Sequence, residues 1–223
     1  MRLNAIENPN LDDLVESLRP AFPVMNKFEQ QVSIQIYRLL CKGSPVTRQM
    51  LAESLQVSVV TLQELLNRWW GIHFDDRNRI VGYWGLSIEP THHRFEVGGE
   101  KLYTWCAWDA LFLPEILEAH ARVESQCATT RARICLTLSP QCVEQFQPGD
   151  AVISFMTPAA ALVKENVAAH FCHFVHFFKS EDAGLAWTGR HSGSFLMTID
   201  QAHRLGYEIN AMRYPDIQKN FEG

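Results

Sequence analysis

The segment Ile72-His73-Phe74-Asp75-Asp76-Arg77-Asn78-Arg79-Ile80-Val81-Gly82-Tyr83-Trp84 has an apolar run at each end and a charged centre. Two β-favouring runs around a polar turn predict a hairpin. The three segments before it have apolar residues at three- and four-residue spacing, which predicts helices. These helices are expected over Gln31–Cys41, Thr47–Leu55 and Val59–Trp70. Three helices followed by a hairpin predict a winged-helix-like domain over residues 29–88, preceded by an N-terminal arm, residues 1–28.

A winged helix suggests DNA binding, so its charge has to be examined. Its third helix carries one cation, Arg68, and residues 29–90 hold six basic and six acidic side chains. Without net positive charge, little affinity arises from counterion release at phosphates. We therefore expect a structural or gating module and no nucleic-acid partner, with a DNA-binding sensor of soft metals as the alternative.

Beyond residue 88 the pattern mixes short strands and helices. A helix is expected over Tyr103–Leu113, ended by Pro114, and another over Pro158–Ala169. A strand is expected over Phe171–Phe178, and Asp200 is the expected cap of a closing helix. The predicted fold class is therefore α+β, with residues 89–223 forming a mixed catalytic domain of short strands.

Composition excludes several classes of protein. The chain has 223 residues, 47% of them hydrophobic and 20% charged, with a formal net charge of −5, as expected for a globular protein and not for a disordered one. Its beginning lacks the apolar core of a secretory signal, and its longest apolar stretch, residues 151–163, is too short to span a bilayer. We therefore expect a cytoplasmic protein with no membrane partner.

Six cysteines remain as candidates for chemistry, because no phosphate-binding loop, dinucleotide fingerprint, HExxH or GxSxG string occurs. In a reducing cytosol they are expected to be free thiols, and they include no CxxC pair. Cys106 and Asp109 are three residues apart in an apolar segment, which on a helix places a thiol beside a carboxylate. A CxxD spacing alone also fits a buried cysteine and a local cap, but an uncompensated carboxylate in apolar surroundings is costly unless it has a partner or a task.

The second candidate is Cys172, within an aromatic segment that also contains His173 and His176. If the segment is a strand, the two histidines lie on opposite faces, which makes a shared metal ion unfavourable. The same alternation places Cys172 and His173 on opposite faces. A cysteine hydrolase that uses this pair is therefore not expected, because its histidine must reach the thiol. A zinc enzyme remains a further alternative.

Together these motifs resemble those of the bacterial organomercurial (alkylmercury) lyases. The resemblance rests on Leu102-Tyr103-x-Trp105-Cys106-Ala107-x-Asp109, on Cys127-Ala128-x-Thr130 and on Phe171-Cys172-x-x-Val175-His176-Phe177-Phe178, in that order. It implies that Cys106 and Cys172 are the mercury-binding catalytic cysteines, that Asp109 is the catalytic aspartate and a further mercury ligand, and that Cys127 is structural. The chain departs from the family at His173, where many members have a second cysteine, and at the bulky Trp108.

The resemblance implies a substrate and a reaction that suit these residue types. Mercury(II) is a soft acid that thiolates bind well, and the leaving carbon must receive a proton. A carboxyl group can take a thiol proton and then deliver it, acting first as base and then as acid. No organic cofactor is expected, since mercury(II) is substrate and product. External thiols are expected for turnover, with transient handover to a mercuric reductase.

Overall fold

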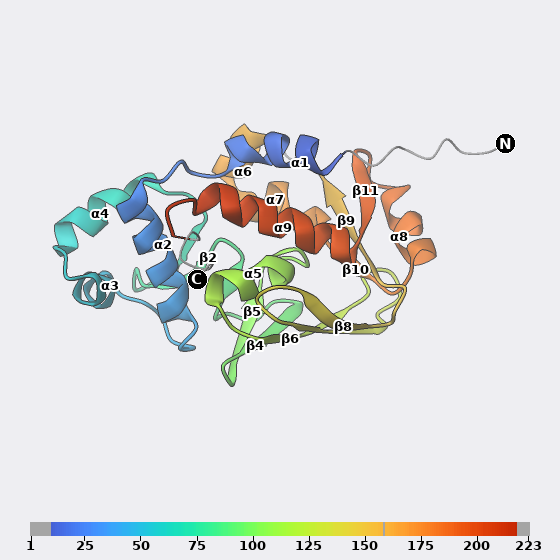
Figure 1. Cartoon of the computed structure of the whole chain (residues 1–223), viewed down its shortest axis with the longest axis horizontal. Helices are drawn as coiled ribbons and strands as arrows, with labels where there is room; N and C mark the ends of the chain where they lie inside the picture. The colour runs from blue at the N-terminus through green and yellow to red at the C-terminus, as the bar shows by residue number, and fades with distance from the viewer. Residues whose placement is uncertain (1–9, 158, 218–223) are drawn as a thin grey trace.

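The computed structural model describes residues 10–157 and 159–217, and two antiparallel sheets organise them (Figure 1). The larger sheet has eight strands in the order β1-β2-β3-β5-β4-β6-β7-β8, and the smaller has the order β10-β9-β11. The strands are β1 (Ile72–Phe74), β2 (Ile80–Tyr83), β3 (Leu86–Ser87), β4 (His93–Val97), β5 (Glu100–Thr104), β6 (Ala121–Gln126), β7 (Arg133–Leu138), β8 (Val143–Gln147), β9 (Val152–Met156), β10 (Phe177–Phe178) and β11 (Ser194–Thr198).

Helices pack around these sheets, so the fold is α+β, as the sequence predicted. No described helix is long and apolar enough to cross a membrane. The α-helices are α1 (Leu11–Leu18), α2 (Lys27–Leu40), α3 (Arg48–Leu55), α4 (Val59–Arg68), α5 (Asp109–Leu117), α6 (Ala160–Glu165), α7 (Val167–His170), α8 (Glu181–Thr188) and α9 (Ile199–Arg213), and two 3-10 helices are η1 (Arg19–Ala21) and η2 (Cys172–Phe174).

The α2–α4 helices and the β1–β2 hairpin form the predicted winged-helix-like unit, at the left of Figure 1. Thr47 and Ser58 begin α3 and α4 by accepting hydrogen bonds from backbone amides that would otherwise lack a partner. The hairpin pairs Ile72 with Tyr83, and β2 continues through β3 into the large sheet. The division at residue 88 stays a prediction, because one sheet runs across it.

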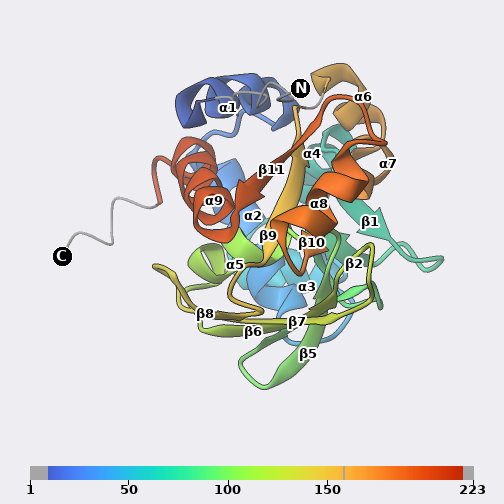
Figure 2. The ribbon, with the colours of Figure 1, turned by 90° about the vertical axis from the view of Figure 1, so that its right-hand side faces the viewer.

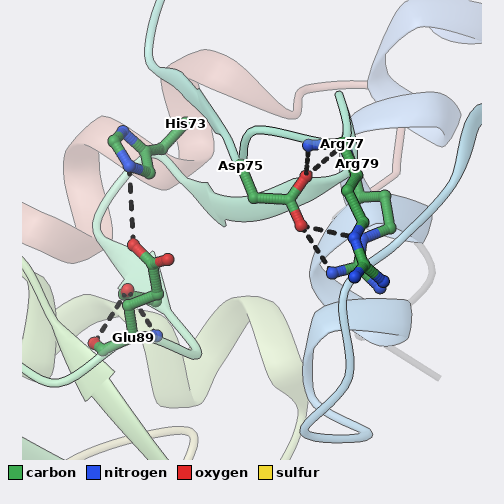
Figure 3. Close-up of polar contacts among 6 residues, drawn as sticks. His73, Asp75, Arg77, Arg79 and Glu89 are labelled. Atoms are coloured by element: carbon green, nitrogen blue, oxygen red, sulfur yellow. Dashed lines mark hydrogen bonds and ion pairs between the residues drawn. The ribbon is translucent and has the colours of Figure 1, made fainter.

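Charged side chains at the hairpin are held by local contacts (Figure 3). The carboxylate of Asp75 accepts hydrogen bonds from the Arg77 and Arg79 amides and from Arg79 Nε at 2.7 Å. His73 lies 3.5 Å from a carboxylate oxygen of Glu89. The side chains of Arg79 and His73 therefore have intramolecular partners that compete with any phosphate.

Around Cys106 the structure corrects the expected helix over residues 103–113. Residues up to Thr104 belong to β5, a turn carries Cys106, and α5 begins only at Asp109. Pro114 does not end α5, which continues to Leu117. The apolar run was ambiguous because strand and buried helix both read as continuous hydrophobic sequence.

The segment 171–178 is also not the expected single strand. Cys172 lies in the 3-10 helix η2, and only Phe177 and Phe178 form β10. The argument that His173 and His176 lie on opposite strand faces was therefore wrong, and their ring centroids are 6.4 Å apart.

Two further expectations concern helix starts. The cap of α9 is Thr198, in a reciprocal capping box with Gln201, and not Asp200. The helix expected from Pro158 is divided into α6 and α7, and Pro158 itself lies outside the described residues.

The core that positions the candidate site lies between α5 and α9, which pack together above the large sheet (Figure 2). Trp108 Nε1 donates to the carbonyl of Ala202 at 2.9 Å, and Asn210 Nδ2 donates to the carbonyl of Phe112 at 3.1 Å. A Cβ on Gly206 would lie 2.6 Å from that of Phe112, so the missing side chain allows the close approach. These contacts with α9 therefore fix the position of α5 and of the residue before it.

Candidate active site

Cys106 and Asp109 meet through a turn and not through a helix face. The backbone amide of Cys106 donates a 2.7 Å hydrogen bond to Oδ2 of Asp109, as a side chain does when it closes a turn. The hydroxyl of Thr104 also donates to the Cys106 carbonyl, at 2.9 Å. Both backbone groups of Cys106 are thus fixed, and the thiol is held beside the carboxyl group.

Cys172 reaches the same place from a distant part of the sequence. The chain leaves α7 at Phe171 and makes one turn of 3-10 helix before Val175. The Val175 carbonyl accepts a 3.3 Å hydrogen bond from the amide of Ala107, the residue after Cys106. This contact joins the two cysteine-bearing loops directly.

The three predicted site residues therefore converge. One ligand atom from each of Cys106, Asp109 and Cys172 lies within 4.8 Å of the others, and within the described ranges no other group of three or more His, Cys, Asp or Glu side chains comes together in this way. Metal–thiolate bonds are about 2.3 Å long for zinc, so two sulfur atoms this close can hold one ion between them. Cys106 is fully buried, and Cys172 and Asp109 are each 6% exposed.

Burial keeps protons on this site. Desolvation raises the pKa of Cys106 well above its usual value, with the Cys172 thiol and the Asp109 carboxyl adding to the effect. Desolvation also raises the pKa of Asp109 to about 6, against the opposing hydrogen bonds from Cys106 and the charge of Arg213. The thiol of Cys106 lowers the pKa of Cys172, yet burial and Asp109 leave it raised. A proton is therefore available within the site near neutral pH.

The space beside these groups is apolar and partly enclosed. Tryptophan and phenylalanine side chains form much of its wall, and aliphatic groups from the arm and from α6–α7 cover it. The lining residues are Leu18, Ala21, Phe22, Trp84, Gly85, Trp105, Trp108, Asp109, Phe112, Val163, Val167, Phe171 and Cys172. Such an apolar lining suits an organic group.

Sequence reasoning missed Gly85 and the pocket-forming role of the arm. Gly85 has a φ of +96°, and a Cβ there would lie 2.5 Å from Cγ of Asp109. The signal was a glycine directly after Trp84 at the end of the hairpin, but its meaning depends on a carboxylate 24 residues later. Phe22 and Leu18 carried no signal, because apolar residues of a short amphipathic helix look alike wherever they pack.

The remaining cysteines lie outside this group of three. Burial raises the pKa of Cys127, but hydrogen bonds from Thr129, Thr130 and nearby backbone lower it more, to about 7. The amide of Ala128 donates to the Phe177 carbonyl at 3.1 Å, so the Cys127 turn fastens β10. All six cysteines are free, and Cys142 is exposed.

Two buried thiols with a carboxyl group beside an apolar pocket, on an α+β fold that begins with a winged-helix-like unit, are features of the class of thiol-dependent enzymes. The chain belongs to the alkylmercury lyase family, whose model (MerB: Alkylmercury lyase) matches residues 86–210. An alkylmercury lyase from Pseudomonas putida is 35% identical over 187 residues, 84% of this chain and 86% of that protein. One from Streptomyces lividans is 37% identical over 171 residues, 77% and 78% of the two chains.

A solved structure agrees with this membership. The crystal structure of the mercury-bound form of MerB2 superposes with a TM-score of 0.73 at 27% identity, covering 89% of this chain and 96% of that one. The membership and the fold therefore confirm the resemblance seen in the separated sequence motifs.

Proposed function

We propose that Cys106, Cys172 and Asp109 perform the reaction of this alkylmercury lyase, the cleavage of a carbon–mercury bond by proton transfer to carbon. The observation that carries the assignment is the convergence of the three ligand atoms within 4.8 Å in a buried site. The thiols supply two soft ligands for mercury, and the carboxyl group supplies the proton route.

The proposed reaction breaks one carbon–mercury bond and forms two sulfur–mercury bonds. One thiol replaces the ligand that accompanies R–Hg⁺, and its proton leaves with that ligand. Asp109 accepts the proton of the other thiol as the second sulfur–mercury bond forms. The protonated carboxyl then delivers its proton to the carbon, the carbon–mercury bond breaks, and the hydrocarbon R–H leaves. The sum is R–Hg⁺ plus two thiols giving R–H, a bis-thiolate mercury(II) and one proton released. The pKa of Asp109, raised to about 6 by burial, suits a group that must both accept and return a proton.

We also propose that the reaction needs no organic cofactor and that its product leaves by exchange with external thiols. The protein's own thiols and carboxyl suffice for one turnover, so no organic cofactor is required. Mercury(II) held by two buried thiolates needs competing external thiols to leave, which supports thiol-dependent turnover and transient handover to a mercuric reductase. All six cysteines are free, as a reducing cytoplasm would keep them.

A DNA-binding role gains no support from the winged-helix-like unit. Four of the six arginine and lysine side chains of residues 29–88 make intramolecular polar contacts: Arg38 with Glu118, Arg48 with Asn78, Arg68 with Glu29 and Arg79 with Asp75. We therefore propose that this unit and the arm cover the site, as Phe22 and Trp84 do.

The test of the assignment is hydrocarbon release from methylmercury and phenylmercury salts, measured by gas chromatography with excess thiol. Cys106→Ser, Cys172→Ser and Asp109→Ala are each expected to lower the rate by at least about a hundredfold, the usual scale for a group in proton transfer. Cys142→Ser, the same change at an exposed thiol, is the matched control and is expected to keep full activity. Full activity in any one of the three would remove that residue from the mechanism.

A further inference from the structure

Arg213, the last residue of α9, is a buried cation that the reaction above does not use. It is 3% exposed, and Nε, Nη1 and Nη2 have no hydrogen-bond partner among the described residues. Its guanidinium instead lies over three aromatic rings, which we term the aromatic cage: Phe22 at 4.7 Å, Trp84 at 5.2 Å and Tyr214 at 5.1 Å from the ring centroids. Cation–π contacts of this kind stabilise a desolvated charge only in part.

The hydroxyl groups nearest the cage bind other partners, and of these the Tyr37 hydroxyl also lies close enough to the guanidinium to interact with it. The Tyr37 hydroxyl donates to the Trp84 carbonyl at 3.0 Å, and Ser33 Oγ lies 2.8 Å from both the Tyr83 and the Tyr214 hydroxyl oxygens. A buried cation without an ion-pair partner is costly, and such a cost persists in a protein where the charge has a task.

The cage connects this charge to the candidate active site. Phe22 and Trp84 form part of the pocket wall as well as holding the guanidinium. Gly85, next to Trp84, lies so near Asp109 that a Cβ on it would be 2.5 Å from Cγ of that residue. Only the side chains of Phe22 and Trp84 therefore need to separate the Arg213 guanidinium from the pocket. In agreement, its charge lowers the pKa of Asp109, opposing the effect of burial.

We propose that Arg213 is a positioning residue that supplies the counter-charge for the buried thiolates and carboxylate of the active site, acting across the Trp84 and Phe22 side chains. This inference rests on the proposed roles of Cys106, Cys172 and Asp109. During the reaction the site carries negative charge out of contact with water, and a fixed cation nearby stabilises that charge without reorganising. The planar, permanently charged guanidinium is suited to such a place, because it is weakly hydrated and stacks on aromatic faces.

The experiment compares Arg213→Lys, Arg213→Met and, as matched control, Arg204→Met on the exposed part of the same helix. Each variant is assayed for hydrocarbon release from phenylmercury, with kcat and KM determined separately and the melting temperature recorded. Arg213→Met is expected to lower kcat about tenfold with little change in KM, while its melting temperature holds or rises, since an apolar residue replaces an unpaired buried charge. Arg213→Lys is expected to recover most of kcat, and Arg204→Met to match the unsubstituted protein.

Equal kcat values for Arg213→Met and Arg204→Met would overturn the proposal. A loss in Arg213→Lys as large as in Arg213→Met would also overturn it, because shape and not charge would then matter. If Arg213→Met does not fold, Arg213→Gln repeats the comparison, and failure of both to fold assigns Arg213 to stability alone. The proposed function fails separately, by activity in Cys106→Ser or Cys172→Ser.

Discussion

The backbone amide of Cys106 donates a 2.7 Å hydrogen bond to Oδ2 of Asp109, so the proposed proton carrier is fixed to the backbone of the proposed nucleophile. Without this hydrogen bond, the Asp109 side chain could rotate away when a bulky organomercurial enters the pocket. Here the turn that ends in α5 holds one carboxyl oxygen and leaves the other for proton transfer. The same hydrogen bond therefore fixes the position of the carboxyl group and keeps it beside the thiol whose proton it is proposed to accept.

The activity is expected to depend on pH through Asp109. Its pKa is raised to about 6, so below that pH the carboxyl is protonated and cannot accept a thiol proton. We predict that kcat/KM for methylmercury falls steadily as pH decreases below about 6, measured between pH 5 and 9 at constant ionic strength. A profile that stays level down to pH 5 would contradict the role of Asp109 as base.

Replacing Asp109 by asparagine is expected to lower the activity and to raise the free energy of unfolding at alkaline pH. A carboxyl whose pKa is higher in the folded state binds protons more tightly there, so its contribution to stability is lost as pH rises from about 4 to above 6. Asparagine has no such loss. We predict that Asp109→Asn raises the free energy of unfolding at pH 8 by about 2–3 kcal/mol more than at pH 4. Urea unfolding at both pH values measures the difference, and equal effects would show that burial does not disfavour the carboxylate.

A single methyl group at Gly85 is expected to displace the carboxyl group of Asp109, the proposed proton carrier. Gly85→Ala places its Cβ 2.5 Å from Cγ of Asp109 and also strains a backbone with φ of +96°. Gly99→Ala is the matched control, because Gly99 has a φ of +83° and no atom within 4 Å of the position of a Cβ. Hydrocarbon release should fall at least about tenfold in Gly85→Ala and stay within twofold in Gly99→Ala, since misplacement of a reacting group costs rate steeply. Equal activities would show that the contact does not position Asp109.

The winged-helix-like unit is expected not to bind DNA. Its described basic side chains are largely engaged with acidic or amide groups, and its charge gives no counterion-release affinity. We predict no retardation of duplex DNA in a gel-shift experiment at low salt, with or without mercury(II). Retardation that weakens steeply with added salt would instead support a nucleic-acid role.

Local sequence determined much of the fold. The side chains of Thr47, Ser58 and Ser180 each accept a hydrogen bond from a backbone amide in the first turn of the helix that follows. The 72–84 hairpin likewise follows from its own turn. These features depend on contacts within a few residues, which is why the sequence alone was sufficient.

The residue types of the site were also readable from the sequence. Two thiols and a carboxylate in apolar segments indicated thiol chemistry with a nearby proton acceptor, and the order of the motifs pointed to the family. Their local conformation was not readable. Cys106 lies in a turn and Cys172 in a 3-10 helix, where uniformly apolar segments had suggested a helix and a strand.

Only the tertiary structure decided which groups meet. Cys172 joins Cys106 through the Ala107–Val175 hydrogen bond, and Arg213 reaches the far side of Trp84 from the end of the last helix. Such contacts join residues far apart in the chain, and they exist because burying the apolar surfaces of the sheet, α5 and α9 leaves few ways to pack them. The sequence gives the chemical type of each residue. The pKa of Asp109 and of the thiols, in contrast, depends on burial and on the groups that the fold places beside them.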